Sequence, residues 1–158
     1  MEIADRIAGD CPQEEIVVVG LLKGSFMFMA DMVRLLHQRQ IRLQLDFMAV
    51  SSYGSGTTPG RLNMSRDIST NISGRFVLLM DDILDTGKTL SFVYDHLLKL
   101  EPSVLKTCVF LDKPDRRKSP FTADYVGYTV PDEFVVGYGL DYDNRYRELP
   151  YVAAVVFD

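Results

Sequence analysis

Three carboxylates and a small hydroxylated turn lie close together near the middle of the chain. In chain order these residues are Asp81, Asp82, Asp85, Thr86, Gly87, Lys88 and Thr89. Free backbone N–H groups at the start of a helix favour a phosphate group, and Gly87 would let that group approach closely. Carboxylates accept hydrogen bonds from vicinal hydroxyl groups, so Asp81 and Asp82 suit a sugar. The pattern therefore predicts a site that holds a phosphate and a hydroxyl-rich group.

The flanking residues place this turn between a strand and a helix. Residues 76–80 form a short unbroken apolar run, which is typical of a strand buried on both faces of a parallel sheet. Within residues 90–100, Val93, Leu97 and Leu100 recur at helical spacing. The turn is thus expected at the carboxyl end of a strand, where open α/β sheets bind their ligands.

Three familiar motifs resemble this turn but do not fit it. A Walker A loop requires a glycine five residues before Gly87, and that position is Asp82. An aspartic-protease dyad built on Asp85 would have the cation of Lys88 beside it, which argues against a shared proton. A phosphatase of the Asp-x-Asp type needs one residue between its carboxylates, whereas two separate Asp82 from Asp85. None of these three sites is expected.

The rest of the chain predicts an α/β fold with a mainly parallel central sheet flanked by helices. Apolar runs predict further strands, at residues 16–22, 43–50, 104–111, 125–130, 135–138 and 152–157. A second helix is expected at residues 26–36, with Ser25 as its N-cap. Residues 51–66 are polar and rich in glycine, so we expect a long loop there.

Length and composition limit the broad class of the protein. The chain has 158 residues, 47% of them hydrophobic, which predicts a single domain over residues 1–158. A net charge of −5 argues against a nucleic-acid surface. Two cysteines, Cys11 and Cys108, give no disulfide framework, which fits a reducing cytoplasm. No apolar stretch reaches membrane-spanning length and the first residues are too polar for a signal peptide, so no membrane association is expected.

The stretch from Val77 to Thr89 resembles the ribose-5-phosphate and diphosphate-binding motif of the type I phosphoribosyltransferases. Four further stretches resemble one branch of that family, the hypoxanthine-guanine phosphoribosyltransferases, and Arg147 follows them at the family's spacing. These stretches are Leu22-Lys23-Gly24-Ser25, Ser51-Ser52-Tyr53-Gly54, Lys113 within residues 111–114, and residues 131–142. They span nearly the whole chain. The resemblance implies the type I phosphoribosyltransferase fold, with a small hood built from N- and C-terminal segments.

The resemblance also implies an enzyme of purine salvage. Such an enzyme transfers the 5-phosphoribosyl group from 5-phosphoribosyl 1-diphosphate to N9 of hypoxanthine or guanine, and it releases IMP or GMP together with diphosphate. Mg²⁺ as cofactor, a homodimer or homotetramer and a cytoplasmic location are implied as well. The transition state would carry oxocarbenium character.

On this resemblance, the phosphate turn and the segment after the first strand bind the donor. The ribose 5′-phosphate would be bound by Asp81, Asp82, Asp85, Thr86, Gly87, Lys88 and Thr89. The diphosphate would be bound by Lys23, Gly24 and Arg147, and a cis peptide is implied between Leu22 and Lys23. A lid carrying Ser52 and Tyr53 would close over the reacting groups.

The purine and the metal would be held by later segments, again by resemblance. The purine would be bound by Ile83, Lys113, Phe134, Val135, Leu140 and Asp141. Asp85 would exchange a proton with N7 of the base. Asp141 would lie near the metal, with Asp81 and Asp82 acting through ribose hydroxyls or water.

Ordinary structural roles remain as alternatives for several of these residues. Lys23 and Gly24 could form a plain turn, Lys113 could be solvated, and Phe134 could belong to the core. Asp141 and Arg147 could form a surface ion pair.

The sequence departs from the family's pattern at two points. The family usually carries more residues before its first strand, and its acidic pair is commonly Glu-Asp, where this chain has Asp81-Asp82. Two rival functions remain open: a phosphoribosyltransferase for adenine, xanthine or orotate, and a module that binds the same ligand to regulate transcription. Lys113 with Phe134 favours a 6-oxopurine, and Asp85 together with a lid favours catalysis.

Overall fold

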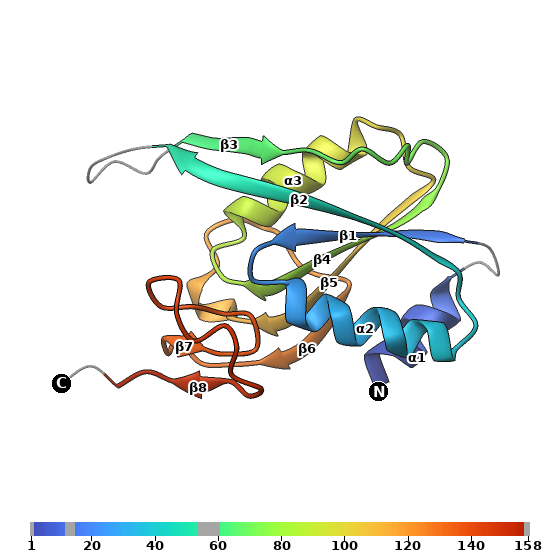
Figure 1. The fold of residues 1–158 in the computed structure, drawn as a ribbon. Coiled ribbons are helices and arrows are strands. Elements are labelled where there is room, and N and C mark those ends of the chain that lie inside the picture. The colour runs from blue at the N-terminus through green and yellow to red at the C-terminus, as the bar shows by residue number, and fades with distance from the viewer. Residues whose placement is uncertain (1, 12–14, 54–60, 157–158) are drawn as a thin grey trace.

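The computed structural model describes residues 2–11, 15–53 and 61–156. Its centre is a six-stranded sheet in the order β3-β2-β1-β4-β5-β6 (Figure 1). The strands are β1 (Ile16–Leu22), β2 (Leu43–Tyr53), β3 (Arg61–Arg66), β4 (Phe76–Leu84), β5 (Val104–Asp112) and β6 (Tyr125–Thr129). All neighbours pair in parallel except β2 and β3, which are antiparallel. The predicted α/β fold with a mainly parallel sheet is confirmed.

Helices cover both faces of this sheet, and alternate strand residues pack against each layer. Helices α1 (Glu2–Asp10) and α2 (Phe26–Gln38) lie over one face, where they bury Val18 and Leu78. Helix α3 (Lys88–Leu98) lies over the other face, against Val17 and Leu79. Burial on both faces explains why β1 and β4 are continuous apolar runs in the sequence.

The direction in which the chain winds reverses between β1 and β4. Strand β1 pairs with β2 on one side and with β4 on the other, and the chain then continues through β5 and β6 away from β2. Two loops therefore diverge at the carboxyl ends of β1 and β4, and open α/β sheets have their ligand crevice at such a point.

The prediction of a long loop over residues 51–66 was wrong at both ends of that range, where the structure has strands. Strand β2 continues to Tyr53, and β3 pairs with it across a bulge between Ala49 and Val50. In β3, half-buried Leu62 and Met64 alternate with exposed polar residues, which is the pattern of an edge strand. Residues 54–60, including the Gly54 of the resemblance, lie outside the described residues. Of the proposed lid, Ser52 and Tyr53 are the last two residues of β2.

Helix α1 was not expected, and the helix boundaries differ slightly from the predicted ones. Helix α3 runs from Lys88 to Leu98, two residues earlier than expected. Ser25 occupies the N-cap position of α2, but its hydroxyl makes no capping hydrogen bond. None of the helices in the described ranges is long and apolar enough to span a membrane.

The segment after β6 forms a small separate layer beside the carboxyl ends of the strands (Figure 1). It contains the antiparallel pair β7 (Val135–Val136) and β8 (Ala153–Ala154). The N-terminal helix α1 packs against α2 and β6, and it lines a cavity together with Tyr138 of the C-terminal segment. We call residues 130–156 the hood.

Candidate functional site

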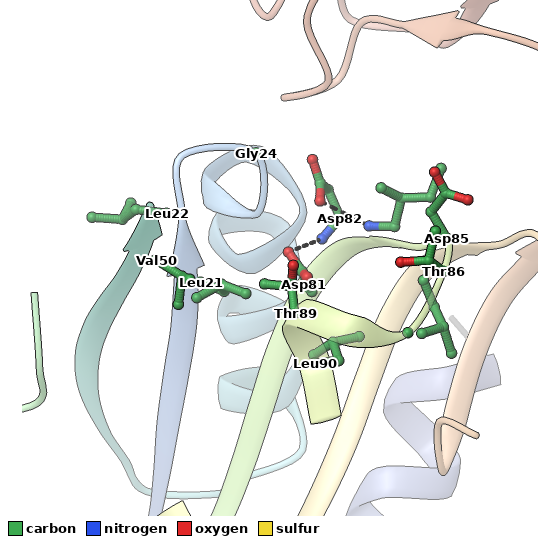
Figure 2. A pocket seen from close by; sticks show the side chains of 13 residues that line it. Leu21, Leu22, Gly24, Val50, Asp81, Asp82, Asp85, Thr86, Thr89 and Leu90 are labelled. Carbon is green, nitrogen blue, oxygen red and sulfur yellow. Dashed lines mark hydrogen bonds between the residues drawn. The ribbon is translucent and has the colours of Figure 1, made fainter. Parts of the chain in front are cut away.

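A cavity of about 320 Å³ lies at the point where the winding reverses (Figure 2). We call it the first cavity. It is lined by the ends of β1, β2 and β4, the turn after β4 and the start of α3, through Leu21, Leu22, Gly24, Val50, Asp81, Asp82, Ile83, Leu84, Asp85, Thr86, Gly87, Thr89 and Leu90. The predicted sugar and phosphate residues are therefore brought together, with the exception of the Lys88 side chain.

The backbone between β1 and α2 approaches the acidic pair closely. The peptide bond between Leu22 and Lys23 is cis, as the resemblance implied. A Cβ atom on Gly24 would lie 1.6 Å from Oδ2 of Asp82, so only glycine fits here. Gly139 of the hood, with φ of +102°, packs on the other side, where a Cβ atom would lie 2.0 Å from the Gly24 carbonyl oxygen. This loop is thus fixed between the acidic pair and the hood, and the Lys23 side chain is exposed.

Asp81 and Asp82 form a buried carboxyl pair at the end of β4. The backbone N–H of Asp82 donates to Oδ1 of Asp81 at 2.9 Å, and that of Ile83 donates to Oδ1 of Asp82 at 2.8 Å. Burial, with the neighbouring Asp82 charge, raises the pKa of Asp81 well above its usual range, and burial also raises the pKa of Asp82. Hydroxyl donors or a cation at this point would stabilise the ionised form of the pair.

The turn from Thr86 to Thr89 is shaped to receive an anion. Gly87 has φ of +82° and occupies the N-cap position of α3. The backbone N–H of Lys88 faces the Thr86 hydroxyl at 3.4 Å, and the first amides of α3 are available to a ligand. The Lys88 side chain is exposed and does not line the cavity, so any role in phosphate binding falls to its backbone.

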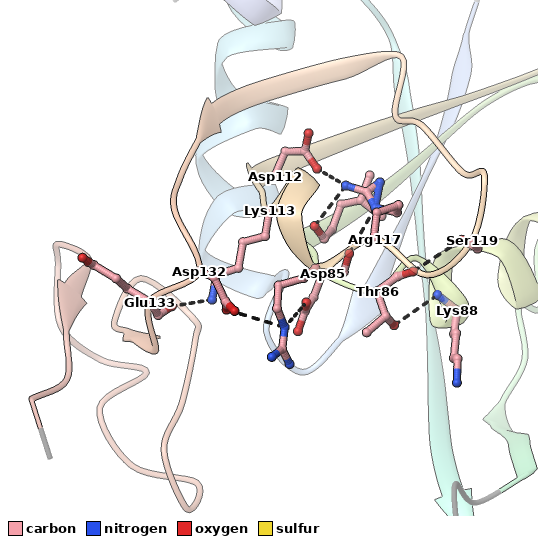
Figure 3. A network of polar contacts seen from close by, with 11 residues as sticks. Asp85, Thr86, Lys88, Asp112, Lys113, Arg117, Ser119, Asp132 and Glu133 are labelled. Atoms are coloured by element: carbon pink, nitrogen blue, oxygen red, sulfur yellow. Dashed lines mark hydrogen bonds and ion pairs between the residues drawn. The ribbon is translucent and has the colours of Figure 1, made fainter.

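Arg117 hydrogen-bonds to the backbone at the start of this turn (Figure 3). The sequence did not predict a role for this residue. Its guanidinium donates to the backbone oxygen of Asp85 at 3.1 Å and to that of Phe121 at 2.7 Å, and it also pairs with the Asp112 carboxylate. The N–H groups of Lys118 and Ser119 donate to the Thr86 oxygen at 2.9 and 3.2 Å. The loop after β5 therefore fixes the backbone of the phosphate turn.

A second cavity of about 480 Å³ adjoins the first. It is lined by Asp82, Ile83, Asp85, Lys113, Arg116, Asp132, Phe134, Val135, Leu140 and Asp141. All six residues expected to bind the purine are among them. Asp82, Ile83 and Asp85 line both cavities, so the end of β4 forms a shared wall.

Lys113 and Phe134 give the second cavity a buried cation and an aromatic face. Lys113 follows β5 and is only 7% exposed, so it is not a solvated surface lysine. Its ammonium donates to the backbone oxygen of Glu133 (Figure 3). Phe134 is 45% exposed and stands edge-on to Tyr142, with ring centroids 5.6 Å apart, so it is not a core residue.

Asp141 and Arg147 form an ion pair within the hood. Their closest atoms are 2.7 Å apart, and Asp141 also accepts a hydrogen bond from the backbone N–H of Asn144 at 2.8 Å. Arg147 donates to the Gly139 oxygen at 2.6 Å, beside the Gly24 loop. The two residues therefore do form an ion pair, as one alternative from the sequence suggested, but this pair lies at the edge of the second cavity.

Comparison with known proteins identifies the family. The model of the phosphoribosyl transferase domain matches residues 1–143. The chain belongs to the type I phosphoribosyltransferases, and the protein is therefore an enzyme of the transferase class. Its relatives place it with the hypoxanthine-guanine phosphoribosyltransferases within that family.

Two curated relatives cover most of the chain. The hypoxanthine-guanine phosphoribosyltransferase of Aquifex aeolicus (strain VF5) is 51% identical over 156 residues, which cover 98% of this chain and 86% of the relative. The hypoxanthine phosphoribosyltransferase of Escherichia coli (strain K12) is 48% identical over 143 residues, or 90% of this chain and 79% of the relative.

Two solved structures share the fold. A hypoxanthine-guanine phosphoribosyltransferase from Bacillus anthracis, with a HEPES molecule in its active site, superimposes with a TM-score of 0.91 at 47% identity and covers 98% of this chain and 90% of that chain. A mutant hypoxanthine phosphoribosyltransferase from Trypanosoma cruzi, complexed with the product IMP, gives a TM-score of 0.90 at 41% identity, with coverage of 98% and 82%.

Proposed function

We propose that the protein transfers the 5-phosphoribosyl group from 5-phosphoribosyl 1-diphosphate to N9 of hypoxanthine or guanine, which yields IMP or GMP and diphosphate. One observation carries the choice of a 6-oxopurine: the buried ammonium of Lys113 lies with Phe134 in the second cavity, next to Asp85. An ammonium has donors only, so it can pair with O6 of the base but not with an amino group. The names of the relatives support the same substrates.

The second cavity is proposed to hold the base. Phe134 offers a flat face for stacking, and Ile83, Val135 and Leu140 provide apolar walls. Lys113 would exchange the Glu133 backbone oxygen for O6 when the purine enters. A buried ammonium that loses one hydrogen-bond acceptor needs a second acceptor in its place. The exchange therefore favours a base whose O6 accepts a hydrogen bond from Lys113.

The first cavity is proposed to hold the ribose 5-phosphate. The phosphate would lie on the turn from Thr86 to Thr89, where helix amides and hydroxyl groups are available. Asp81 and Asp82 would accept hydrogen bonds from the ribose hydroxyls, which relieves the cost of keeping two adjacent carboxylates ionised.

The diphosphate is proposed to leave between the Gly24 loop and the hood. Backbone amides at Lys23 and Gly24, the Lys23 ammonium and the Arg147 guanidinium would neutralise its charge. Carboxylate oxygens at Asp81, Asp82 and Asp141 are hard donors that suit Mg²⁺, and substrate oxygens and water would complete its shell. When bound, Mg²⁺ supplies positive charge to the departing diphosphate.

In the proposed reaction, N9 of the purine forms a bond to C1′ of the ribose while the bond from C1′ to the diphosphate oxygen breaks. Positive charge develops on the sugar, as in glycoside chemistry. The proton on N7 passes to Asp85, whose carboxylate lies on the shared wall beside both the base and the sugar.

One assay tests this proposal. The protein is incubated with 5-phosphoribosyl 1-diphosphate, Mg²⁺ and, in turn, hypoxanthine, guanine, xanthine and adenine, and nucleotide formation is measured. We expect IMP and GMP, and no AMP. A binding measurement by calorimetry complements it, with GMP expected to bind more tightly than ATP and with no hydrolysis of ATP. Formation of AMP, or a preference for ATP, would overturn the assignment.

We also propose a cytoplasmic homodimer or homotetramer, with Ser52 and Tyr53 contributing to a lid. Cys108 is fully buried, and burial raises the pKa of its thiol to about 12, which keeps it protonated and unreactive. Such a thiol suits a reducing compartment.

Light scattering on the purified protein would give the assembly state, and a monomer would contradict the proposed homodimer or homotetramer.

A further inference from the structure

Arg116 lies between two carboxylates at the edge of the second cavity. It is the last residue of the short 3₁₀ helix η1 (Pro114–Arg116), which follows β5. Its Nε atom donates to Oδ1 of Asp85 at 3.1 Å and lies 3.6 Å from Oδ1 of Asp132 (Figure 3). The segments after β4, β5 and β6 thus meet through one guanidinium, and all three residues line the cavity.

Two arginines together fix Asp85, each through a different part of it. Arg117 donates to its backbone oxygen, which sets the path of the main chain. Arg116 donates to Oδ1 of its side chain, which sets the orientation of the carboxylate. A carboxylate has lone pairs on both oxygens, so Oδ2 can accept a proton donor while Oδ1 stays bonded to Arg116.

The contact is too exposed to be a source of stability. The side chains of Arg116, Asp85 and Asp132 are 47%, 39% and 51% exposed. Exposed ion pairs of this kind contribute little to the free energy of unfolding, because water screens them and side-chain freedom is lost. Any consequence of removing Arg116 should therefore appear in the position of Asp85 and not in the stability of the fold.

We propose that Arg116 is a positioning residue for the general base: it holds Oδ1 of Asp85 so that Oδ2 faces N7 of the purine. This inference rests on the proposed function. The proton moves from N7 to Oδ2 as N9 bonds to C1′ and diphosphate leaves, and Arg116 remains on Oδ1 throughout. Asp132 anchors Arg116 from the hood side, so the base is oriented by the same segment that carries Phe134. A base that is itself oriented by a third group is a recurring arrangement in catalysis.

The test compares Arg116→Gln with two further variants of the same ion-pair cluster and with one control variant. Arg116→Gln removes the charge and most of the donors, Arg116→Lys keeps the charge, and Asp132→Asn removes only the anchor. Lys99→Gln removes a positive charge from an exposed position at the end of α3 that lines neither cavity. For each variant, kcat, the KM values of hypoxanthine and of 5-phosphoribosyl 1-diphosphate, and the thermal unfolding midpoint are measured.

We expect Arg116→Gln to lower kcat roughly twofold to fivefold, in the range that an exposed charge pair can give. The KM of the donor and the unfolding midpoint should stay unchanged. Arg116→Lys should recover part of the loss, Asp132→Asn should show a smaller loss, and Lys99→Gln should behave as the wild type.

The decisive readout is the coupling between Arg116 and Asp85. In an Asp85→Asn background, Arg116→Gln should have no further effect on the residual kcat, because there is no longer a base to orient. An unchanged kcat in Arg116→Gln, or the same fold loss in both backgrounds, would overturn the proposal. Failure of the proposed function is distinct: it would appear as a wild-type protein that uses neither hypoxanthine nor guanine.

Discussion

Asp85 borders both cavities, so on the proposed function its carboxylate would lie within reach of both the base and the sugar. We predict that Asp85→Asn folds normally and binds 5-phosphoribosyl 1-diphosphate, yet loses about 10² to 10⁴-fold in kcat, because the amide is nearly isosteric but cannot take a proton. Steady-state kinetics, with donor binding followed by calorimetry, check this. A kcat near the wild-type value would remove Asp85 from the proton transfer.

Lys113 is the residue that should select the 6-oxo group. Lys113→Met keeps the length of the side chain and removes its donors, so we expect kcat/KM for hypoxanthine and guanine to fall about 10- to 100-fold, the range for a charged hydrogen bond. Binding of the diphosphate donor should hardly change, since Lys113 does not line the first cavity. Lys99→Met, at an exposed position at the end of α3 that lines neither cavity, serves as the control. Efficient use of adenine by the wild type would show that Lys113 does not select the base.

At the scale of elements, the loop between β1 and α2 depends on the absence of a side chain at Gly24. Gly24→Ala should displace the Asp82 carboxylate, with a cost of about 1 to 3 kcal/mol in unfolding free energy and a marked loss of donor affinity. Gly9→Ala in α1 is the matched control, because no atom lies within 4 Å of its Cβ position and alanine favours a helix. Chemical unfolding and donor titration of both variants test this, and equal donor affinity in the two would contradict it.

Asp46 ties β2 to the segment that leads into β4. Its carboxylate accepts hydrogen bonds from the N–H groups of Phe47, Ser69 and Thr70 at 2.7 to 2.8 Å. Burial would raise its pKa, but these donors outweigh burial and lower the pKa from 3.8 to about 2.

This depressed pKa gives a pH dependence with a definite sign. The ionised form stabilises the fold above about pH 4, and the contribution disappears as the pH falls from about 4 to about 2. Asp46→Asn should therefore lose about 2 kcal/mol at pH 7, and the deficit against the wild type should shrink toward pH 2. Urea unfolding at several pH values measures it, with exposed Asp95→Asn as the charge-matched control. A deficit that is independent of pH would contradict the assignment.

The sequence predicts well those strands that are buried on both faces of the sheet. It predicts less well the edge strand, whose existence depends on pairing with a distant part of the chain. The apolar runs of β1 and of the first part of β4 predict strands without ambiguity, because a strand covered on both faces is mostly apolar. Strand β3 was missed, since an edge strand with one solvated face differs little from a polar loop.

Some residues of the candidate site could be predicted from the sequence, and others became apparent only in the structure. Lys113 and Phe134 could be named from the resemblance, and the structure brings both into one cavity with Asp85. Arg116 and Arg117 could not, because both contact Asp85, which follows β4, and Arg116 also contacts Asp132, which follows β6. A polar stretch after β5 gives no local signal of these contacts. Contacts between the ends of neighbouring strands become visible only when the sheet order is known.

At the scale of the whole molecule, the shared wall at the end of β4 determines which ligands compete. On the proposed function, a nucleoside monophosphate would span both cavities, with its base on one side of the wall and its phosphate on the other. Hypoxanthine would occupy the second cavity and the ribose 5-phosphate of the donor the first, so the two substrates could bind together, whereas the product would exclude either of them. IMP should therefore inhibit competitively against both substrates in initial-rate measurements, and a pattern competitive against only one would contradict this. Because IMP and either substrate would exclude each other, the concentration of IMP relative to the two substrates would set the fraction of the enzyme that is free to begin a new turnover.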